Sequence, residues 1–474
     1  MYNLCFMGRE GFLDYTPLVF NEIKRSFDPD ATGVIVVLDT REAAYVRKRF
    51  GNSVELCILS EFMNEHWGEF TLEKLCYYEE EYDASPIWKY IYTDRFLIHR
   101  DYDYCVHTTA GLFAFWEHIF TTYHIDFYFD EVIGTLFTYV AYLVGRKLGA
   151  DYYSLLIMRS VGLDLTHHYI LNDPFEMIYD FPENYRDIEY SPEQIKAAED
   201  FLTGFEEKHS RPAFMQFSGR KPRFKASFLL LPFFWIRQRF FNPHTVDKGN
   251  YIFYKDYQTA FDPLKYYLRY QKSKKYYNKA DLNRKFVYYP LHLQPEASTI
   301  VCAQKYEKQL YFLDNLAKSL PADTVIYAKE HYSFLGSRPN SFYEQLKEYP
   351  NIVLIDPWED SFALIKHCEC VATLTGTAGQ EAMLLRRPVI MGGDILYENA
   401  PGVMRIDDIY GRYEEAMENW KQPTREEIVQ YLTAYMSCAR RGNTYIMSED
   451  RLKPDNIRLV VQSMFDYFKE MKPR

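Results

Sequence analysis

The segment Cys370–Met391, CVATLTGTAGQEAMLLRRPVIM, places a strand, a glycine turn, a helix and a second strand within twenty-two residues. Its apolar start, 371–374, is typical of a buried parallel strand, and small and hydroxyl-bearing residues follow. Good helix formers then lead to Pro388, which ends the helix before a second strand at 389–391. So compact a unit indicates a parallel α/β sheet.

The turn in this segment is a candidate anion-binding site. It contains Thr375, Gly376, Thr377 and Gly379, and Glu381 follows one helical turn later. The first N–H groups of a helix lack backbone partners and lie at the positive end of the dipole, so they favour a phosphate. We expect Glu381 to reach a ribose hydroxyl. An ordinary strand–turn–helix with a threonine cap explains the same residues equally well.

Apolar runs alternate with amphipathic stretches in two parts of the chain, which predicts two α/β units. In the first unit we expect strands at 4–7, 34–38, 54–59 and 124–129, and helices at 15–26, 41–50 and 134–147. In the second we expect strands at 286–289, 324–328, 352–355, 371–374 and 389–391, and a helix at 304–319. The predicted division is 1–165 and 286–440 for the two α/β domains, 166–285 for a helical connecting region, and 441–474 for a carboxyl-terminal helix.

The connecting region carries an unusual charge. The chain has a formal net charge of −11, yet residues 220–285 contain 16 Lys and Arg against 4 Asp, a balance of +12 that leaves −23 elsewhere. An apolar run at 226–236 is flanked by Arg220, Lys221, Arg223, Lys225, Arg237 and Arg239. The run is too short to span a bilayer, but it suits an interfacial helix on anionic lipid; a buried helical hairpin between the domains is the alternative. Nucleic acid is not an expected partner, because the rest of the chain is acidic.

Cysteines and the amino terminus predict a cytoplasmic protein. The eight cysteines show no paired CxxC spacing, so we expect reduced thiols and no metal site. The amino terminus lacks the charged start and long apolar stretch of a signal peptide, and no stretch reaches the length of a membrane span. The expected location is the cytoplasm, with peripheral contact at the inner face of the membrane through 220–241.

Four motifs of the second unit occur in order and carry a family resemblance. They are YYPLHLQPEAST at 288–299, YAKEH at 327–331, IDPWEDSFALIKHC at 355–368 and TLTGTAGQEAMLLRRPVIM at 373–391. This part of the chain resembles the bacterial capsular polysaccharide biosynthesis family, whose characterised members include transferases of 3-deoxy-D-manno-octulosonic acid (Kdo) from a CMP donor. The resemblance implies a GT-B-like α/β fold, with two Rossmann-like domains facing a cleft and the nucleotide held mainly by the second.

The resemblance also implies roles for individual residues. Thr375, Thr377 and Gly379 match the phosphate-facing turn, and Glu381 matches the acidic position after it. His331 resembles the histidine of the His-Pro motif in the more distant GT-B sialyltransferases, which binds the donor phosphate, although Tyr332 stands where that motif has proline. Asp130 and Glu131 resemble the acidic pair of the first domain.

Glycosyl transfer explains why such residues would be needed. The charge on the departing nucleotide must be neutralised, and a base must take the proton of the acceptor hydroxyl. Lys329, His331 and the threonine turn are predicted to do the first without a metal, and Glu131 or Asp130 the second. His292 follows a strand and is expected to contact donor or acceptor, as the next candidate base. A hydrogen-bonded structural histidine and a solvated lysine remain the alternatives.

These patterns favour a glycosyltransferase of surface polysaccharide synthesis. We expect a nucleotide-activated donor, with CMP-Kdo as the first candidate, a glycan or lipid-linked acceptor, and no further cofactor. The first alternative is a nucleotide-sugar 2-epimerase, which has the same architecture and a comparable Gly-Gln-Glu turn like 379–381. The second is a noncatalytic scaffold in a polysaccharide assembly complex.

Overall fold

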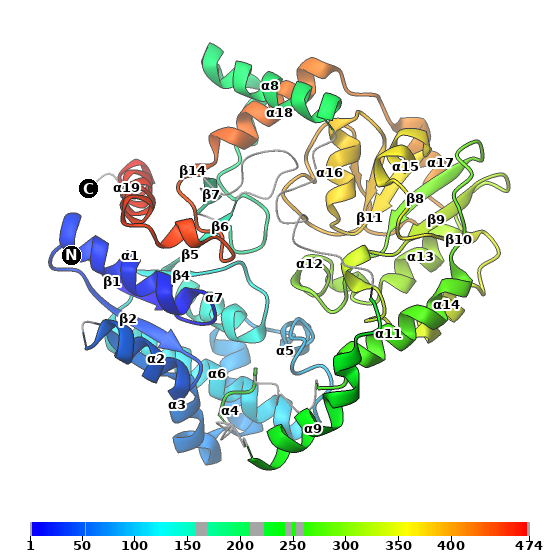
Figure 1. Ribbon diagram of the computed structural model, residues 1–474. Helices are drawn as coiled ribbons and strands as arrows, with labels where there is room; N and C mark the ends of the chain where they lie inside the picture. The colour runs from blue at the N-terminus through cyan, green and yellow to red at the C-terminus, as the bar shows by residue number, and fades with distance from the viewer. Residues whose placement is uncertain are drawn as a thin grey trace.

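The computed structural model describes residues 2–52, 54–157, 168–171, 173–208, 222–241, 249–252 and 260–471. Two parallel sheets, each covered by helices, form two Rossmann-like domains (Figure 1). The predicted α/β, GT-B-like fold class is confirmed.

The first sheet has the strand order β3-β2-β1-β4-β5, and all of its pairings are parallel. Its strands are β1 (Asn3–Met7), β2 (Thr32–Val37), β3 (Glu55–Ile58), β4 (Phe127–Asp130) and β5 (Asp151–Ser154). Its helices are α1 (Phe12–Ser26), α2 (Thr40–Phe50), α3 (Leu59–His66), α4 (Leu72–Glu81), α5 (Ile87–Ile91), α6 (Tyr102–Tyr123) and α7 (Leu136–Leu148). The chain reverses direction across the sheet between β1 and β4, which is where open α/β sheets bind ligands.

The second sheet has the corresponding order β10-β9-β8-β11-β12-β13, also parallel throughout. Its strands are β8 (Phe286–Pro290), β9 (Val325–Lys329), β10 (Ile352–Ile355), β11 (Cys370–Thr373), β12 (Val389–Met391) and β13 (Val403–Arg405). Its helices are α12 (Ala297–Ile300), α13 (Gln309–Ala317), α14 (Asn340–Leu346), α15 (Ser361–His367), α16 (Thr377–Leu384) and α17 (Tyr413–Asn419). Here the switch point lies between β8 and β11.

Segments distant in sequence complete both domains. Helix α8 (Pro192–Lys208) packs on α18 (Arg425–Ser437) and contributes to the core of the second domain. Helix α19 (Pro454–Met471) packs on α1 in the first domain (Figure 1). There the ring of Phe468 stacks on that of Phe127, with centroids 4.6 Å apart. A small antiparallel sheet of β6 (Leu156–Ile157), β7 (His168–Ile170) and β14 (Arg440–Arg441) lies near this return of the chain. The last helix therefore belongs to the core of the first domain.

The described part of the basic segment, 222–241, is helical and exposed. It comprises a 3₁₀ turn (Ala226–Leu230), α9 (Leu231–Ile236) and a π-helical turn (Arg237–Phe241); Arg220 and Lys221 lie outside the described residues. Leu229 and Phe233 are each 71% exposed and Phe240 is 62% exposed. The alternative of a buried hairpin is therefore wrong for this part of the segment. Within the described ranges, no helix is long and apolar enough to cross a membrane.

The described chain before and after this segment contacts different domains. Before it, helix α8 packs on α18 of the second domain. After it, Tyr251 donates a hydrogen bond to the buried carboxylate of Asp94 in the first domain (2.8 Å). Further along, α11 (Asp262–Ser273) contacts α14 of the second domain, and Arg269 donates to the backbone oxygen of Ser337 (2.9 Å). In chain order, the exposed apolar segment thus lies between a contact with the second domain and a contact with the first.

Candidate active site

The predicted threonine turn joins β11 to α16, and two glycines are required by its packing. The N–H of Gly376 donates to Thr373 Oγ1 (2.9 Å), and a Cβ at Gly376 would lie 2.7 Å from that same oxygen. A Cβ at Gly379 would lie 2.5 Å from the hydroxyl of Tyr397. Gly379 therefore packs inward against Tyr397, and its lack of a side chain serves the turn itself.

The two threonines of the turn have different surroundings. Thr375 is 4% exposed, and its hydroxyl donates to the backbone oxygen of Ser298 (2.6 Å). Thr377 is partly exposed at the first position of α16, where backbone N–H groups have no helical partner. Glu381 is also partly exposed on this helix, and its charge adds to burial in raising the pKa of Tyr288. An anion at this helix start would therefore meet Thr377 and backbone N–H groups.

His292 lies behind the turn and holds it in place. Its Nε2 accepts the N–H of Leu374 (3.0 Å) and lies 3.1 Å from Thr373 Oγ1. Because Nε2 is an acceptor, the ring proton is assigned to Nδ1. Burial, with help from the charge of Arg338, lowers the pKa of His292 to about 3. The side chain predicted as a third base is thus a neutral ring that positions the turn.

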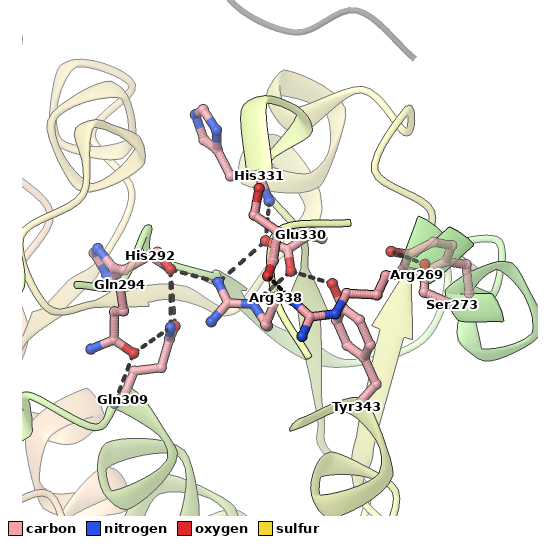
Figure 2. Close-up of polar contacts among 11 residues, drawn as sticks. Arg269, Ser273, His292, Gln294, Gln309, Glu330, His331, Arg338 and Tyr343 are labelled. Atoms are coloured by element: carbon pink, nitrogen blue, oxygen red, sulfur yellow. Dashed lines mark hydrogen bonds and ion pairs between the residues drawn. The ribbon is translucent and has the colours of Figure 1, made fainter. Parts of the chain in front are cut away.

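Lys329 is the last residue of β9, two strands from the turn, and His331 lies in the loop after it, which a buried ion pair fixes. Glu330 is 1% exposed; it pairs with Arg338 (2.7 Å) and accepts the hydroxyl of Tyr343 (2.7 Å). Arg338 also donates to the backbone oxygen of His292 (2.6 Å), so one guanidinium connects the loops after β8 and β9 (Figure 2).

The two residues predicted here to bind the donor, Lys329 and His331, have side chains that point in different directions. The ring of His331 points away from the ion pair (Figure 2) and stacks on Tyr332, with centroids 4.7 Å apart. Lys329 is 7% exposed, and its ammonium donates to Ser361 Oγ at the start of α15 (2.7 Å). Burial lowers the pKa of His331 while Glu330 opposes the shift. The neutral imidazole has one N–H to donate.

In the first domain, the acidic pair lies at the switch point and is joined to the glycine turn after β1. Arg9 lies 3.5 Å from both Asp130 Oδ1 and Glu131 Oε2. Asp130 is fully buried and accepts the hydroxyl of Tyr128 (2.7 Å). Burial raises the pKa of Asp130, and Arg9 opposes that rise. The side chain of Glu131 is 38% exposed, so it is the member of the pair that a substrate can reach.

Helix α12 connects the two halves of the candidate site. Ser298 accepts the hydroxyl of Thr375 from the second domain, and a Cβ at Gly134, three residues after Glu131, would lie 3.6 Å from Ala297 Cβ. Figure 1 shows α12 between the two domains. The same Cβ would lie 3.9 Å from Arg95 Nη2, and the buried Nε of Arg95 has no hydrogen-bond partner among the described residues. The loop that carries Glu131 and the helix that supports the threonine turn are therefore in contact.

Several of these groups were not predicted from the sequence. Arg95, Ser361 and the Glu330–Arg338 pair give no signal in a single chain, because the role of each depends on contacts that appear only in the folded structure. For Arg9 alone there was a local signal, since it lies in the glycine turn after the first strand. Within the described ranges, no cluster of His, Cys, Asp and Glu has the arrangement of a metal site, and all eight cysteines are free thiols.

The family comparison concerns mainly the second domain, and the structural comparisons cover more of the chain. Residues 239–439 match the family model described as capsule polysaccharide biosynthesis protein. No curated protein matches the chain. Among solved structures, the chain is similar to KpsC from Thermosulfurimonas dismutans, a β-Kdo 2,4 transferase, with 16% identity, a TM-score of 0.38, and coverage of 69% of this chain and 88% of that one.

Two further solved structures show a similarity of the same order. The β-Kdo 2,7 transferase of Thermosulfurimonas dismutans KpsC is 12% identical, with a TM-score of 0.35 and coverage of 90% of this chain and 89% of that one. The UDP-GlcNAc 2-epimerase of Methanocaldococcus jannaschii, in complex with UDP-GlcNAc and UDP, is 11% identical, with a TM-score of 0.29 and coverage of 90% and 97%. The resemblance found in the sequence is confirmed by the family model, which matches residues 239–439, the part of the chain that carries the threonine turn, Lys329 and His331.

Proposed function

We propose that this protein is a metal-independent glycosyltransferase of capsular polysaccharide synthesis. It transfers a sugar, with Kdo from CMP-Kdo as the first hypothesis, to a glycan or lipid-linked acceptor. The observation that carries the proposal is the start of α16 with Thr377, which shares the carboxyl edge of the second sheet with Lys329 and His331. The family match of residues 239–439 supports the choice of pathway.

The second domain supplies positive potential for a departing nucleotide. The start of α16 offers N–H groups and the hydroxyl of Thr377, while Lys329 adds a full charge and His331 a neutral N–H donor. Groups that are already fixed stabilise developing charge without reorganising during the reaction. The Glu330–Arg338 pair and the His292 bonds provide this fixation. A nucleoside monophosphate carries less charge than a diphosphate, so these donors suffice for it without a divalent ion.

The first domain supplies the base in this proposal. The side chain of Glu131 is partly exposed, and Arg9, 3.5 Å away, pairs with its carboxylate and orients it. A carboxylate at the switch point takes the proton of the acceptor hydroxyl as the new glycosidic bond forms. Asp130 is buried against Tyr128 and Arg9, so it holds Arg9 in place and does not meet the acceptor.

A lipid-linked acceptor would place the enzyme at a membrane surface. The exposed apolar side chains of α9 and its flanks, with Arg223, Lys225, Arg237 and Arg239 beside them, suit contact with anionic lipid. We place the protein in the cytoplasm, in peripheral contact with the membrane through this segment.

Nucleotide release tests the proposal. The purified protein is incubated with CMP-Kdo and with a panel of UDP-sugars, with and without EDTA, and free nucleotide is measured. We expect CMP release that EDTA does not change. Thr377→Val should weaken CMP binding in calorimetry by roughly tenfold, the order of a lost hydrogen bond to a charged group, while Glu131→Gln should abolish release with CMP affinity nearly unchanged. The exposed residues Thr122 and Glu183 provide matched controls, Thr122→Val and Glu183→Gln.

The outcomes separate the competing functions. Release of UDP alone, or loss of release with EDTA, contradicts the Kdo hypothesis. Conversion of a UDP-sugar to its 2-epimer without an acceptor would establish the epimerase instead. A folded protein that binds no nucleotide and releases none would establish a scaffold.

A further inference from the structure

An open cavity of about 600 Å³ lies outside the proposed donor site. It lies between the start of the exposed segment, helix α11 and the loop after β10. Its lining includes three aromatic side chains and three polar ones: Phe224, Tyr267, Trp358, Arg223, Gln271 and Lys274. None of these residues belongs to the proposed donor site.

Two large aromatic side chains of the cavity are unusually exposed to solvent. Phe224 is 56% exposed and Trp358 is 41% exposed. Phe224 meets Tyr267 edge to face, with ring centroids 5.9 Å apart, so the two rings support each other. Large aromatic faces left in contact with water at a cavity are typical of a binding surface, because apolar rings are otherwise buried. The apolar face of a pyranose ring is a suitable partner for them.

The polar side of the cavity favours an anion. Lys274 donates to Gln271 Oε1 (2.7 Å), and its ammonium lies 5.0 Å from the centre of the Tyr270 ring, which orients it. Arg223 is a second cation of the lining, opposed by a single carboxylate, that of Asp356. Asp356 accepts the N–H of Trp358 (2.9 Å), so it shapes the loop that presents the indole. Two cations against one carboxylate leave the lining positive.

The cavity shares its edge of the sheet with the proposed donor site. The loop that carries Asp356 and Trp358 leads directly to Ser361, whose hydroxyl accepts from Lys329. A ligand in the cavity therefore lies on the same side of the second sheet as the departing nucleotide.

We infer that this cavity binds an anionic carbohydrate, through stacking on Trp358 and Tyr267 and an ion pair from Lys274 and Arg223 to a sugar carboxylate. Gln271 and Asp356 supply the polar groups that recognise sugar hydroxyls. The identification of this carbohydrate as part of the acceptor rests on the proposed function. The inference that the cavity binds a carbohydrate does not depend on it.

Binding is measured by calorimetry and by tryptophan fluorescence, because Trp358 reports directly on the cavity. The probes are Kdo, N-acetylneuraminic acid and trigalacturonic acid, which carry carboxylates, and maltotriose, which is neutral. We expect a carboxylated probe to bind and quench, with maltotriose at least tenfold weaker. Trp358→Ala and Lys274→Gln should each lower the affinity at least fivefold. The controls are Lys272→Gln, an exposed lysine at the end of α11, two residues before Lys274 and outside the lining, and Trp67→Ala, a tryptophan of the first domain that is 37% exposed.

The measurements distinguish a failure of this inference from a failure of the proposed function. The inference is overturned if no carboxylated probe binds the wild-type protein, or if both cavity variants bind as the wild type does. Thermal stabilisation by CMP reports on the donor site and should be unchanged in Trp358→Ala. If the carboxylated probes do not bind but CMP still stabilises the protein, the cavity assignment is wrong and the proposed glycosyltransferase stands. If the probes bind but CMP does not stabilise the protein, only the donor-site assignment is wrong.

Discussion

At the scale of single residues, the histidine after β8 shows how a candidate base becomes a positioning group. The sequence placed His292 at the end of a strand, and that placement is correct, since β8 ends at Pro290. Whether its ring faces the ligand or the protein depends on Leu374 and Thr373, which are more than eighty residues away. No local pattern contains that information.

The buried neutral ring predicts a pH dependence of stability. The pKa of His292 is lowered from its ordinary value of 6.5 to about 3. Below pH 6.5 the unfolded chain therefore binds a proton at this histidine that the folded chain does not bind. The contribution of His292 to the free energy of unfolding falls as pH falls from 6.5 towards 3, by about 1.4 kcal/mol per pH unit. Between pH 6.5 and 5, urea unfolding should show the wild-type protein losing about 2 kcal/mol of stability relative to His292→Gln, which lacks this titrating group.

The exposed residue His367 gives the control for this measurement. His367→Gln should keep the wild-type pH dependence, because that ring is solvated in both states. Buried Glu42 works in the opposite direction: its pKa is raised to about 7, so its contribution is lost as pH rises from 4.5 to 7. A His292→Gln protein with an unchanged slope between pH 6.5 and 5 would contradict the neutral assignment.

At the scale of elements, strands and helices were predicted well where the pattern is local. The strands β10 and β12 have the predicted bounds, and α16 begins within the predicted turn. The strands β5 and β13 were missed, because each is short and lacks a continuous apolar run. The role of the segment around α9 was left open between burial and membrane contact, since periodicity alone does not distinguish a buried apolar helix from an exposed one.

The exposure of this segment predicts binding to anionic membranes. Vesicles that contain phosphatidylglycerol should bind the wild-type protein at low salt, and phosphatidylcholine vesicles should not. Replacing Arg223, Lys225, Arg237 and Arg239 with Gln should weaken binding by about 1 kcal/mol per charge, and added salt should reproduce the effect. Phe233→Ser should weaken binding in a way that salt does not reproduce, because it removes apolar insertion.

A matched change elsewhere controls for net charge. Lys308→Gln with Lys421→Gln, both exposed on the second domain, should leave vesicle binding unchanged. Wild-type protein that ignores anionic vesicles at low salt would rule out the membrane as the partner of this surface.

At the scale of the whole molecule, the two sheets could be predicted from the sequence. The packing of helices on elements distant in sequence could not. The amphipathic pattern of 454–468 predicts a helix, and α19 confirms it. That this helix packs on α1, at the far end of the sequence, follows from tertiary packing that one sequence does not reveal. The same holds for α8, which lies within the predicted connecting region but packs on α18. The predicted site residues share this limit: their strand ends were foreseen, but their partners were not.

The docking of α19 predicts a local loss of stability when its main anchor is removed. Phe468 is 5% exposed and contacts Phe127, Phe129 and Tyr153. Phe468→Ala should destabilise the first domain by roughly 3 to 5 kcal/mol through the cavity it leaves. Hydrogen exchange should show reduced protection in β1, β4 and α1, with the second sheet unchanged.

The control for this change lies on the same helix. Leu459 is 42% exposed, so Leu459→Ala should alter stability by less than about 0.5 kcal/mol. Equal losses of protection in both sheets after Phe468→Ala would show that the two domains unfold as one unit.

The position of α19 also has a consequence for how the protein is made. The core of the first domain joins residues 4–171 to residues 457–468, so it stays incomplete until residues 457–468 have been synthesised. At about 5 to 20 residues per second, translation of the intervening chain takes about 15 to 60 s. During that time the face of β4 that carries Phe127 and Phe129 lacks its covering helix. The domain of β1 to β5 is therefore completed only after the second sheet has been synthesised, and its nascent form presents an apolar surface suited to a chaperone.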